Sequence, residues 1–236
     1  MSVSVKGVIR HRGLMSHVVH GKMSLVQTLF PTEWTGTIST IWPPASVREE
    51  LEALAYTPRS FDWEECTFGM TAAFDQTWSD VTIRIRLNPD SDVSQATLDT
   101  LEQTWKAGIE TTWSDRWGIG RSDEVTCPIR VRVRWVDSYP HHDVRVNTGQ
   151  KCFNAMTVGP VQCPTNSARW HTSDGGMVAA HEAGHMLGNP DEYVDLNCPD
   201  RDPVGTGTVM DNNSSVVPRR LLSTCASHVG SSVVAL

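Results

Sequence analysis

The most constraining feature of the sequence is the stretch HEAGHMLGNPD, which places His181, Glu182, His185, Gly188 and Asp191 in the pattern HExxHxxGxxD. On a helix, residues i and i+4 lie about one turn apart on the same face, so the imidazoles of His181 and His185 can converge on one cation. Glu182 is too close to His181 along the helix to be a comfortable third ligand, but it is well placed to hydrogen-bond a water on that cation. The pattern therefore indicates a catalytic metal site.

The residues after the second histidine predict a helix end and a further ligand. Glycine readily adopts the left-handed conformation in which a helix stops and the chain turns back, so Gly188 predicts the end of the helix. Pro190 prevents the helix from resuming, and the turn directs Asp191 toward the cation. Inside the helix, Gly184 costs about 1 kcal/mol relative to alanine, which indicates that bulk is not tolerated beside the metal.

With these residues the sequence resembles the metzincin clan of zinc peptidases, in the minority form in which aspartate replaces the third histidine, as in the small secreted snapalysin-type enzymes. The resemblance implies that the two histidines and Asp191 bind Zn²⁺ and that Glu182 is the general base. It also implies a methionine in a tight turn beneath the ligands, and Met210, within residues 207–211, fits that role.

Two features of the site have alternatives. The tyrosine that some relatives carry two residues after the methionine is replaced here by Asn212, which leaves Tyr193 as a candidate donor to the oxyanion. The third ligand could instead be Asp211, because residues 207–211 match the GTxxD string of the aspzincins. We favour Asp191, since its spacing is tied to the helix-ending glycine. Glu192 is too near the second histidine to be the later glutamate ligand of thermolysin-like enzymes.

Length and charge limit the other classes of function. The chain has 236 residues, enough for one domain and an N-terminal extension. We divide it into an extension, residues 1–76, which is a pro-segment, a delivery signal or part of the fold, and a zincin-like catalytic domain, residues 77–236. A formal net charge of −7 argues against nucleic acid as a partner. No apolar run is long enough to span a membrane. The N-terminus does not resemble a secretory signal. We expect a monomer.

The six cysteines, an even number, favour a protein that works outside the cytosol. Cys152 and Cys163 can close a short loop, and Cys198 and Cys225 can connect the loop after the helix with the C-terminal segment. The connectivity stays open because many pairings are possible, and buried thiols in a cytosolic protein are the alternative. Cys66 invites comparison with the thiol that blocks zinc in latent metzincins, but its neighbours do not match that motif.

Hydropathy alternation predicts the elements before the motif. Apolar and polar residues alternate at 81–87 and at 129–135, which indicates two strands with one buried face each, and a third short strand is expected at 143–146. Between the first two strands lies a helix capped near Ser94. Its apolar face consists of Leu98, Leu101, Trp105, Ile109, Thr112 and Trp113. Arginines occupy the other face of both strands, which suits solvent or acidic neighbours.

The order strand, helix, strand, strand, strand, active-site helix resembles the upper lobe of a metzincin. We therefore expect an α+β, zincin-like fold, with a twisted mixed sheet, an active-site helix and a small irregular C-terminal lobe after the methionine turn. Ser173 and Asp174 form a good N-cap pair for the active-site helix, and Pro218 opens a last helix. The resemblance also implies an edge strand that binds an extended peptide by strand addition. Its residues are Asn154, Ala155, Met156, Thr157 and Val158.

The sequence as a whole predicts a zinc-dependent endopeptidase of bacterial type that hydrolyses a polypeptide substrate. We expect it to work outside the producing cell, as a secreted enzyme or as a toxin effector exported by a delivery machine; a cytoplasmic location is the alternative. The alternative function is a non-catalytic zincin-like module that binds a peptide without cutting it, although such a module has no need of the base Glu182.

Overall fold

The centre of the fold is a mixed β-sheet. The computed structural model describes residues 57–66, 68–120, 126–149, 151–154, 159–162 and 165–236, and residues 58–236 form one compact unit. The strands of the sheet are β1 (Thr57–Glu65), β2 (Phe68–Thr77), β3 (Asp80–Pro89), β6 (Arg130–Trp135), β7 (His142–Asn147) and β10 (Arg169–His171). β2 and β3 are antiparallel, whereas β6 and β7 run parallel to β3, and β10 runs parallel to β7.

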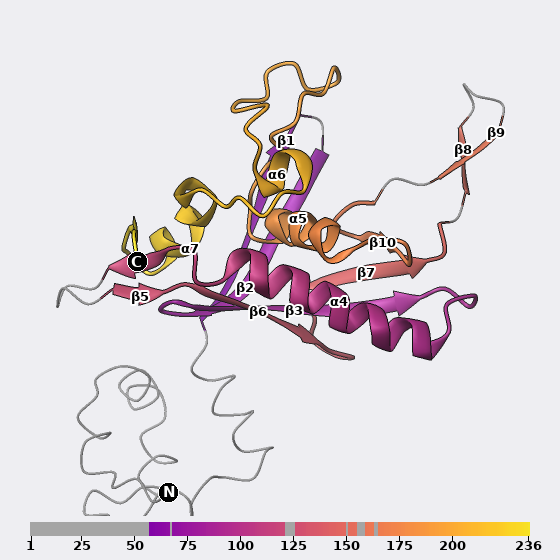
Figure 1. The fold of residues 1–236 in the computed structure, drawn as a ribbon, viewed down its shortest axis with the longest axis horizontal. Helices are drawn as coiled ribbons and strands as arrows, with labels where there is room; N and C mark the ends of the chain where they lie inside the picture. Colours follow the sequence, from indigo (N-terminus) through magenta and orange to yellow (C-terminus); the bar gives the residue numbers. More distant parts are fainter. Residues whose placement is uncertain (1–56, 67, 121–125, 150, 155–158, 163–164) are drawn as a thin grey trace, which may run out of the picture. The chain divides into compact units, whose positions relative to one another are not determined.

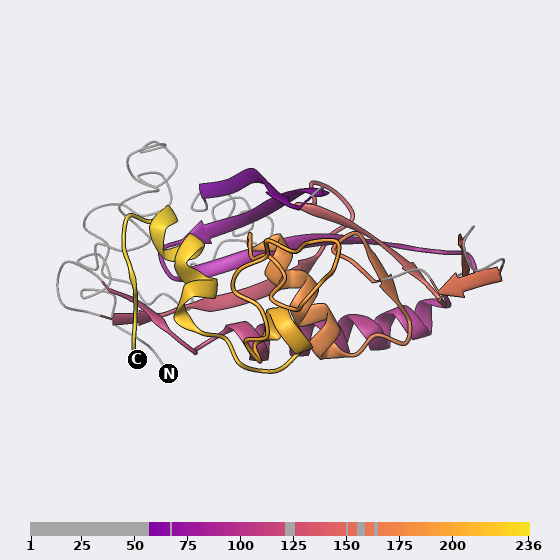
Figure 2. The same cartoon turned by 90° about the horizontal axis from the view of Figure 1, so that it is seen from above.

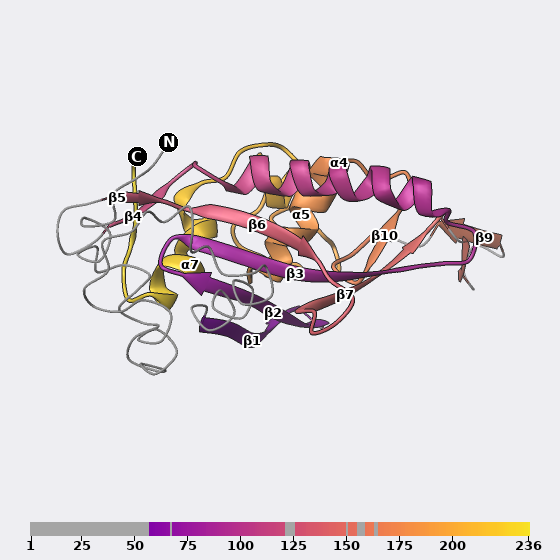
Figure 3. The same cartoon turned by 90° about the horizontal axis from the view of Figure 1, so that it is seen from below.

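β6 and β7 lie on opposite sides of β3. The backbone of Arg84 bonds to His141 just before β7, and the carbonyl of the next residue, Ile85, accepts from Val136 just after β6. Successive residues of a strand direct their backbone groups to opposite sides, so the two partners cannot share one side. Figure 3 shows the resulting order, with β6, β3, β2 and β1 following one another across the sheet.

The predicted strands 81–87 and 129–135 are confirmed as β3 and β6. Val81, Ile83 and Ile85 are fully buried on one face of β3, as period-two alternation requires. The arginines on the other face have acidic partners, as the like-charge rows suggested. Their pairs are Arg84 with Asp75, Arg86 with Asp143, and Arg132 with Asp80.

Two helices cover the buried face of the sheet. The first, α4 (Gln95–Trp113), begins after Ser94, whose Oγ accepts from the backbone N–H of Thr97 at 3.1 Å. Its buried residues are the six that the helical spacing predicted, from Leu98 to Trp113. The second helix, α5 (Gly176–Met186), carries the metal motif and packs against α4. Figure 1 shows the two helices side by side, and Figure 2 shows α5 lying over the strands.

The segment expected to bind substrate is not an edge of the main sheet where it is described. β8 (Lys151–Asn154) pairs with β9 (Gly159–Gln162) in a separate two-stranded sheet. Asn154, the one described residue of the expected edge strand, pairs with Gly159 of β9. Ala155, Met156, Thr157 and Val158 lie outside the described residues.

Part of the expected N-terminal extension belongs to the sheet. Residues 57–76 form β1 and nearly all of β2, so the fold begins before the predicted boundary at residue 77. Residues 1–56 lie outside the described part of the chain. These strands were not predicted, although apolar and acidic residues alternate from Phe61 to Glu64.

One predicted cysteine pair is wrong. Cys198 forms a disulfide with Cys66, with 5.5 Å between the two Cα atoms, whereas Cys225 is a buried free thiol. Cys225 lies on α7, where its side chain is part of the core and does not reach the loop of Cys198. The Cys152–Cys163 pair concerns side chains outside the described residues.

The chain after α5 is largely without regular secondary structure. It contains the short helices α6 (Val209–Asn212), η3 (Arg219–Leu222) and α7 (Ser223–His228). Its last strand, β11 (Val233–Val234), completes a small sheet with β4 (Gly118–Gly120) and β5 (Thr126–Pro128). In the part of the chain that the structure describes, no helix has the length and apolar character needed to cross a membrane.

The disulfide yields a prediction about stability. Cys66 and Cys198 are 132 residues apart, so their bond restricts the unfolded chain strongly, and replacing both with serine should lower the free energy of unfolding by about 2–4 kcal/mol. Urea unfolding with tryptophan fluorescence measures this change. Cys127→Ser, which alters a free thiol, is the matched control, and equal midpoints for the double variant and the control would contradict the prediction.

Candidate metal centre

The turn before α5 is closed by the carboxylate of Asp174. The predicted N-cap pair, Ser173 and Asp174, is wrong. The N-cap residue is Gly175, which makes no side-chain capping bond. The carboxylate of Asp174 instead accepts from the backbone N–H of His171 at 2.6 Å and from the hydroxyl of Thr165 at 2.9 Å, so it closes the turn that leads into the helix. Ser173 makes no capping bond to the helix either.

Two tryptophans of α4 hold α5 in register. The indole N–H of Trp105 donates to the carbonyl of Asp174, and that of Trp113 donates to the carbonyl of Ala180, both at 2.8 Å. Gly108 of α4 and Gly176 of α5 let the two helices approach closely. A Cβ on Gly108 would collide with the Gly176 backbone. These contacts with α4 therefore fix the position and rotation of α5, the helix that carries the histidines.

His181, His185 and Asp191 meet at one point. The Nε2 atoms of His181 and His185 lie 3.0 and 3.2 Å from Oδ1 of Asp191. All three potential ligand atoms lie within 4.8 Å of one another, and no other group of three such residues occurs among the described residues. The predicted ligand set is thus brought together by the fold, and it can hold a metal ion.

Both histidines are oriented by backbone carbonyls. Nδ1 of His181 lies 2.8 Å from the carbonyl oxygen of Val209, and Nδ1 of His185 lies 2.9 Å from that of Asn189. A carbonyl only accepts, so each Nδ1 carries the proton and donates it. Each Nε2 is then directed at Asp191 from the opposite side of its ring, which is the arrangement in which proteins present histidine to a metal.

Gly188 makes the predicted turn. Its φ is +90°, and its N–H donates to the carbonyl of His185 at 2.9 Å. A side chain here would be strained by the backbone and would also press against the ring of Phe61 on β1. The turn returns the chain along the helix end, so that Asp191 reaches the histidines.

Met210, the methionine of the predicted turn, packs against Gly184 of α5. It is fully buried at the start of α6. A Cβ on Gly184 would collide with Sδ of Met210 and approach Trp113 closely. The glycine is therefore needed for contact with the methionine, which gives a physical reason for the cost that the sequence analysis noted.

The rival ligands are engaged elsewhere. Oδ2 of Asp211 accepts from the backbone N–H of Gly207 at 2.6 Å, which closes the turn before α6. The carboxylate of Glu192 is buried and bound by Arg220 and by the hydroxyls of Thr206 and Thr208. Neither belongs to the group that can hold a metal, so Asp191 is the third candidate ligand.

Glu182 is a buried carboxylate beside the ligands. It is 5% exposed, and its Oε2 has no hydrogen-bond partner among the residues that the structure describes. Burial raises the pKa of Glu182 above its ordinary value, against the opposing charges of His185 and His181. A buried polar atom without a partner calls for an explanation, and a bound water or substrate group would supply one.

The contact between Asp191 and His185 shifts the pKa of each side chain toward its charged form. Burial alone would raise the pKa of Asp191, but its contacts with His181 and His185 lower it strongly, so it is an anion at neutral pH. Burial lowers the pKa of His185, but the contact with Asp191 and the charge of Glu182 raise it more. Tyr193 lies at the rim, where burial and the negative charge of Asp191 raise its pKa to about 12. Its role as oxyanion donor stays a prediction.

Two residues near the ligands were missed. Trp63 of β1 stacks on His185, with 6.2 Å between ring centroids and 27° between planes. The alternation of Phe61 and Trp63 with Asp62 and Glu64 is a strand signal that could have revealed it. Arg201 forms an ion pair with Asp191, and no pattern in the sequence distinguishes it from a surface arginine.

Comparisons of the chain with protein-family models, with curated proteins and with solved structures give no match.

The ligand set predicts which substitution abolishes metal binding. Purified protein should contain about one metal ion per chain, and Asp191→Ala should lower the affinity at least about 100-fold, because it removes a ligand outright and even supporting residues commonly contribute 10- to 100-fold. Asp211→Asn keeps the oxygen that binds Gly207 and should bind metal like the wild type. Elemental analysis and titration with a chelating indicator measure both. Metal loss in the Asp211 variant alone would assign the third ligand to Asp211.

Proposed function

We propose that the protein is a zinc-dependent endopeptidase. The observation that carries the proposal is the pair of histidines whose Nε2 atoms face the Asp191 carboxylate, beside a Glu182 oxygen that has no hydrogen-bond partner among the described residues. Two imidazole nitrogens and one carboxylate oxygen are a donor set that suits catalytic zinc, which keeps a further position for water. A purely structural zinc site would be closed by a fourth protein ligand.

The residues divide the chemical work between them. A bound zinc ion would supply Lewis acidity for a water nucleophile and for the scissile carbonyl. Glu182 accepts the proton of the attacking water at its carboxylate and passes it to the leaving amine. Its raised pKa suits this exchange, because a base whose pKa lies closer to the working pH both takes up and returns a proton readily. His181 and His185, fixed by their carbonyl partners, keep the ligand atoms in place.

The arrangement of elements adds support for a metzincin-like peptidase. Of the expected order, β3, α4, β6, β7 and α5 follow one another along the chain, but β4 and β5 come between α4 and β6, and the last main-sheet strand before α5 is β10 and not the expected strand 154–158. Met210 lies beneath the ligand helix, and its neighbour Val209 binds His181. These features are compatible with the resemblance, and the proposed peptidase activity follows from the site.

The proposed site of action is outside the producing cell. The Cys66–Cys198 disulfide supports this location, because such bonds persist in oxidising surroundings and are rare in the cytosol. Export by a delivery machine and use as a toxin effector are forms of the same proposal. Measuring the protein in the culture medium and in washed cells of the producing strain distinguishes export from a cytoplasmic role.

Glu182→Gln tests the mechanism. The amide cannot accept a proton, so turnover should fall at least about 100-fold, within the range of general-base contributions. The metal content should stay that of the wild type, because Glu182 is not among the ligands. Digestion of casein and of a peptide library, with and without a chelator, gives the turnover.

Three results are distinguishable in this test. Chelator-sensitive cleavage by the wild type that is lost in Glu182→Gln agrees with the proposal. Full activity in the variant would contradict the role of Glu182. A wild type that binds both zinc and peptides but cuts none would identify the non-catalytic module instead.

A further inference from the structure

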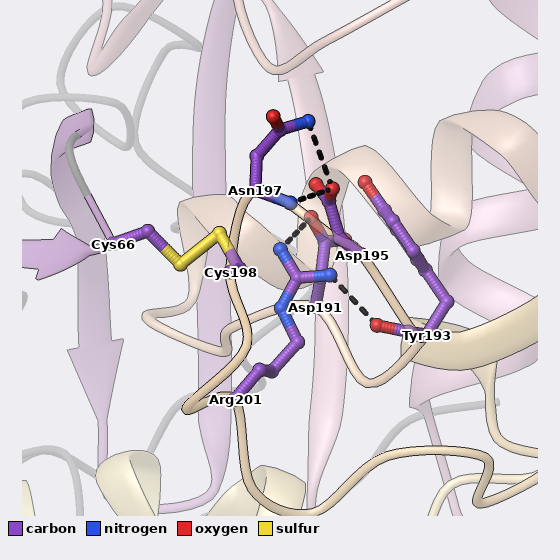
Figure 4. Close-up of a disulfide and its surroundings, with 7 residues drawn as sticks. All are labelled: Cys66, Asp191, Tyr193, Asp195, Asn197, Cys198 and Arg201. Carbon is purple, nitrogen blue, oxygen red and sulfur yellow. Dashed lines mark hydrogen bonds and ion pairs between the residues drawn. A yellow bond between two sulfur atoms is a disulfide. The ribbon is translucent and has the colours of Figure 1, made fainter.

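The two carboxylate oxygens of Asp191 face different partners. Oδ1 lies toward the two histidines, whereas Oδ2 lies 3.4 Å from Nη2 of Arg201 (Figure 4). The Arg201 side chain is only 6% exposed and the Asp191 side chain 12%. A buried arginine is uncommon unless its charge is paired, so the contact is more than a surface ion pair.

Arg201 is held in place by groups other than Asp191. Its Nη1 donates to the backbone carbonyl of Tyr193 at 2.8 Å, and its guanidinium lies 4.6 Å from the centre of the Tyr193 ring. Its backbone N–H donates to the carbonyl of Cys198 at 3.2 Å, and Cys198 is bonded to Cys66 at the turn between β1 and β2. The loop therefore presents a fixed cation to the outer oxygen of Asp191.

We propose that Arg201 is a positioning residue that reserves Oδ2 of Asp191, so that Asp191 offers a single oxygen to the metal. A free carboxylate can bind a cation through one oxygen or through both. A second oxygen would occupy the coordination position that a reacting water needs. Arg201 thus keeps the site open for chemistry. The inference rests on the metal site of the proposed function, but it does not require that the substrate is a peptide.

The test uses Co²⁺ as a spectroscopic probe and zinc absorption-edge spectroscopy to count ligands. Wild type, Arg201→Met and Arg201→Lys are loaded with Co²⁺ and then with Zn²⁺. Methionine fills the space of the stem without the charge, whereas lysine restores a cation. Arg145→Met is the matched control, since it removes an arginine from a carboxylate pair with Asp90 that involves no metal ligand. Thermal unfolding of each metal-free protein shows whether it is folded.

The expected result is a change in coordination confined to one variant. Wild type, Arg201→Lys and Arg145→Met should share the intense visible Co²⁺ absorption of a four-coordinate site. Arg201→Met should lose intensity as Asp191 binds through both oxygens, and its zinc spectrum should gain one oxygen ligand. Identical spectra for wild type and folded Arg201→Met would overturn the proposal.

Two further outcomes separate this inference from the proposed function. The expected spectral change in a protein that cuts no peptide would support the role of Arg201 and contradict the peptidase. A wild type that binds neither Co²⁺ nor Zn²⁺ would overturn both. If Arg201→Met does not fold, Arg201→Ala takes its place; loss of Co²⁺ intensity in folded Arg201→Ala would support the proposal, and a spectrum identical to the wild type would overturn it.

Discussion

The site depends on the two hydrogen bonds that bind the Nδ1 protons of His181 and His185 to backbone carbonyls. One carbonyl belongs to Val209 and the other to Asn189, at 2.8 and 2.9 Å. Each bond fixes both the tautomer and the rotation of a ring, so the Nε2 atoms are directed at the candidate metal position by the protein alone. The rest of the fold can be understood as the structure that keeps these two carbonyls where they are.

The turn that contains Val209 is secured from both sides. The backbone N–H of Glu192 donates to the carbonyl of Met210 at 2.8 Å, and the buried Glu192 carboxylate binds Arg220 with both oxygens. Glu192 directly follows Asp191 in the chain. Its bond to Met210 therefore connects the third candidate ligand, Asp191, to the turn whose Val209 carbonyl orients His181. The Glu192 side chain is 2% exposed and that of Arg220 44%, so removing Arg220 would leave the buried Glu192 charge without its cation, which is destabilising.

Sequence reasoning succeeded where a local pattern determines the structure. Alternation identified β3 and β6, and helical spacing identified the buried face of α4 from Leu98 to Trp113. The ligands were predictable because the helix period and the turn at Gly188 fix their relative positions within a short segment. Sequence reasoning failed where contacts between segments far apart in the chain determine the structure. The pairing of Cys66 with Cys198 spans 132 residues, and the burial of Arg201 depends on a loop conformation that no periodicity reports. The capping prediction at Asp174 failed because its carboxylate satisfies the preceding turn instead of the helix.

The most direct test of the account is a crystal structure of the zinc-loaded protein, with anomalous scattering measured on both sides of the zinc absorption edge. We predict one zinc peak, bound by Nε2 of His181, Nε2 of His185 and Oδ1 of Asp191, with Oδ2 of Asp191 still on Arg201. A zinc ion bound by Asp211, a zinc ion at another place on the chain, or no zinc peak at all would contradict it.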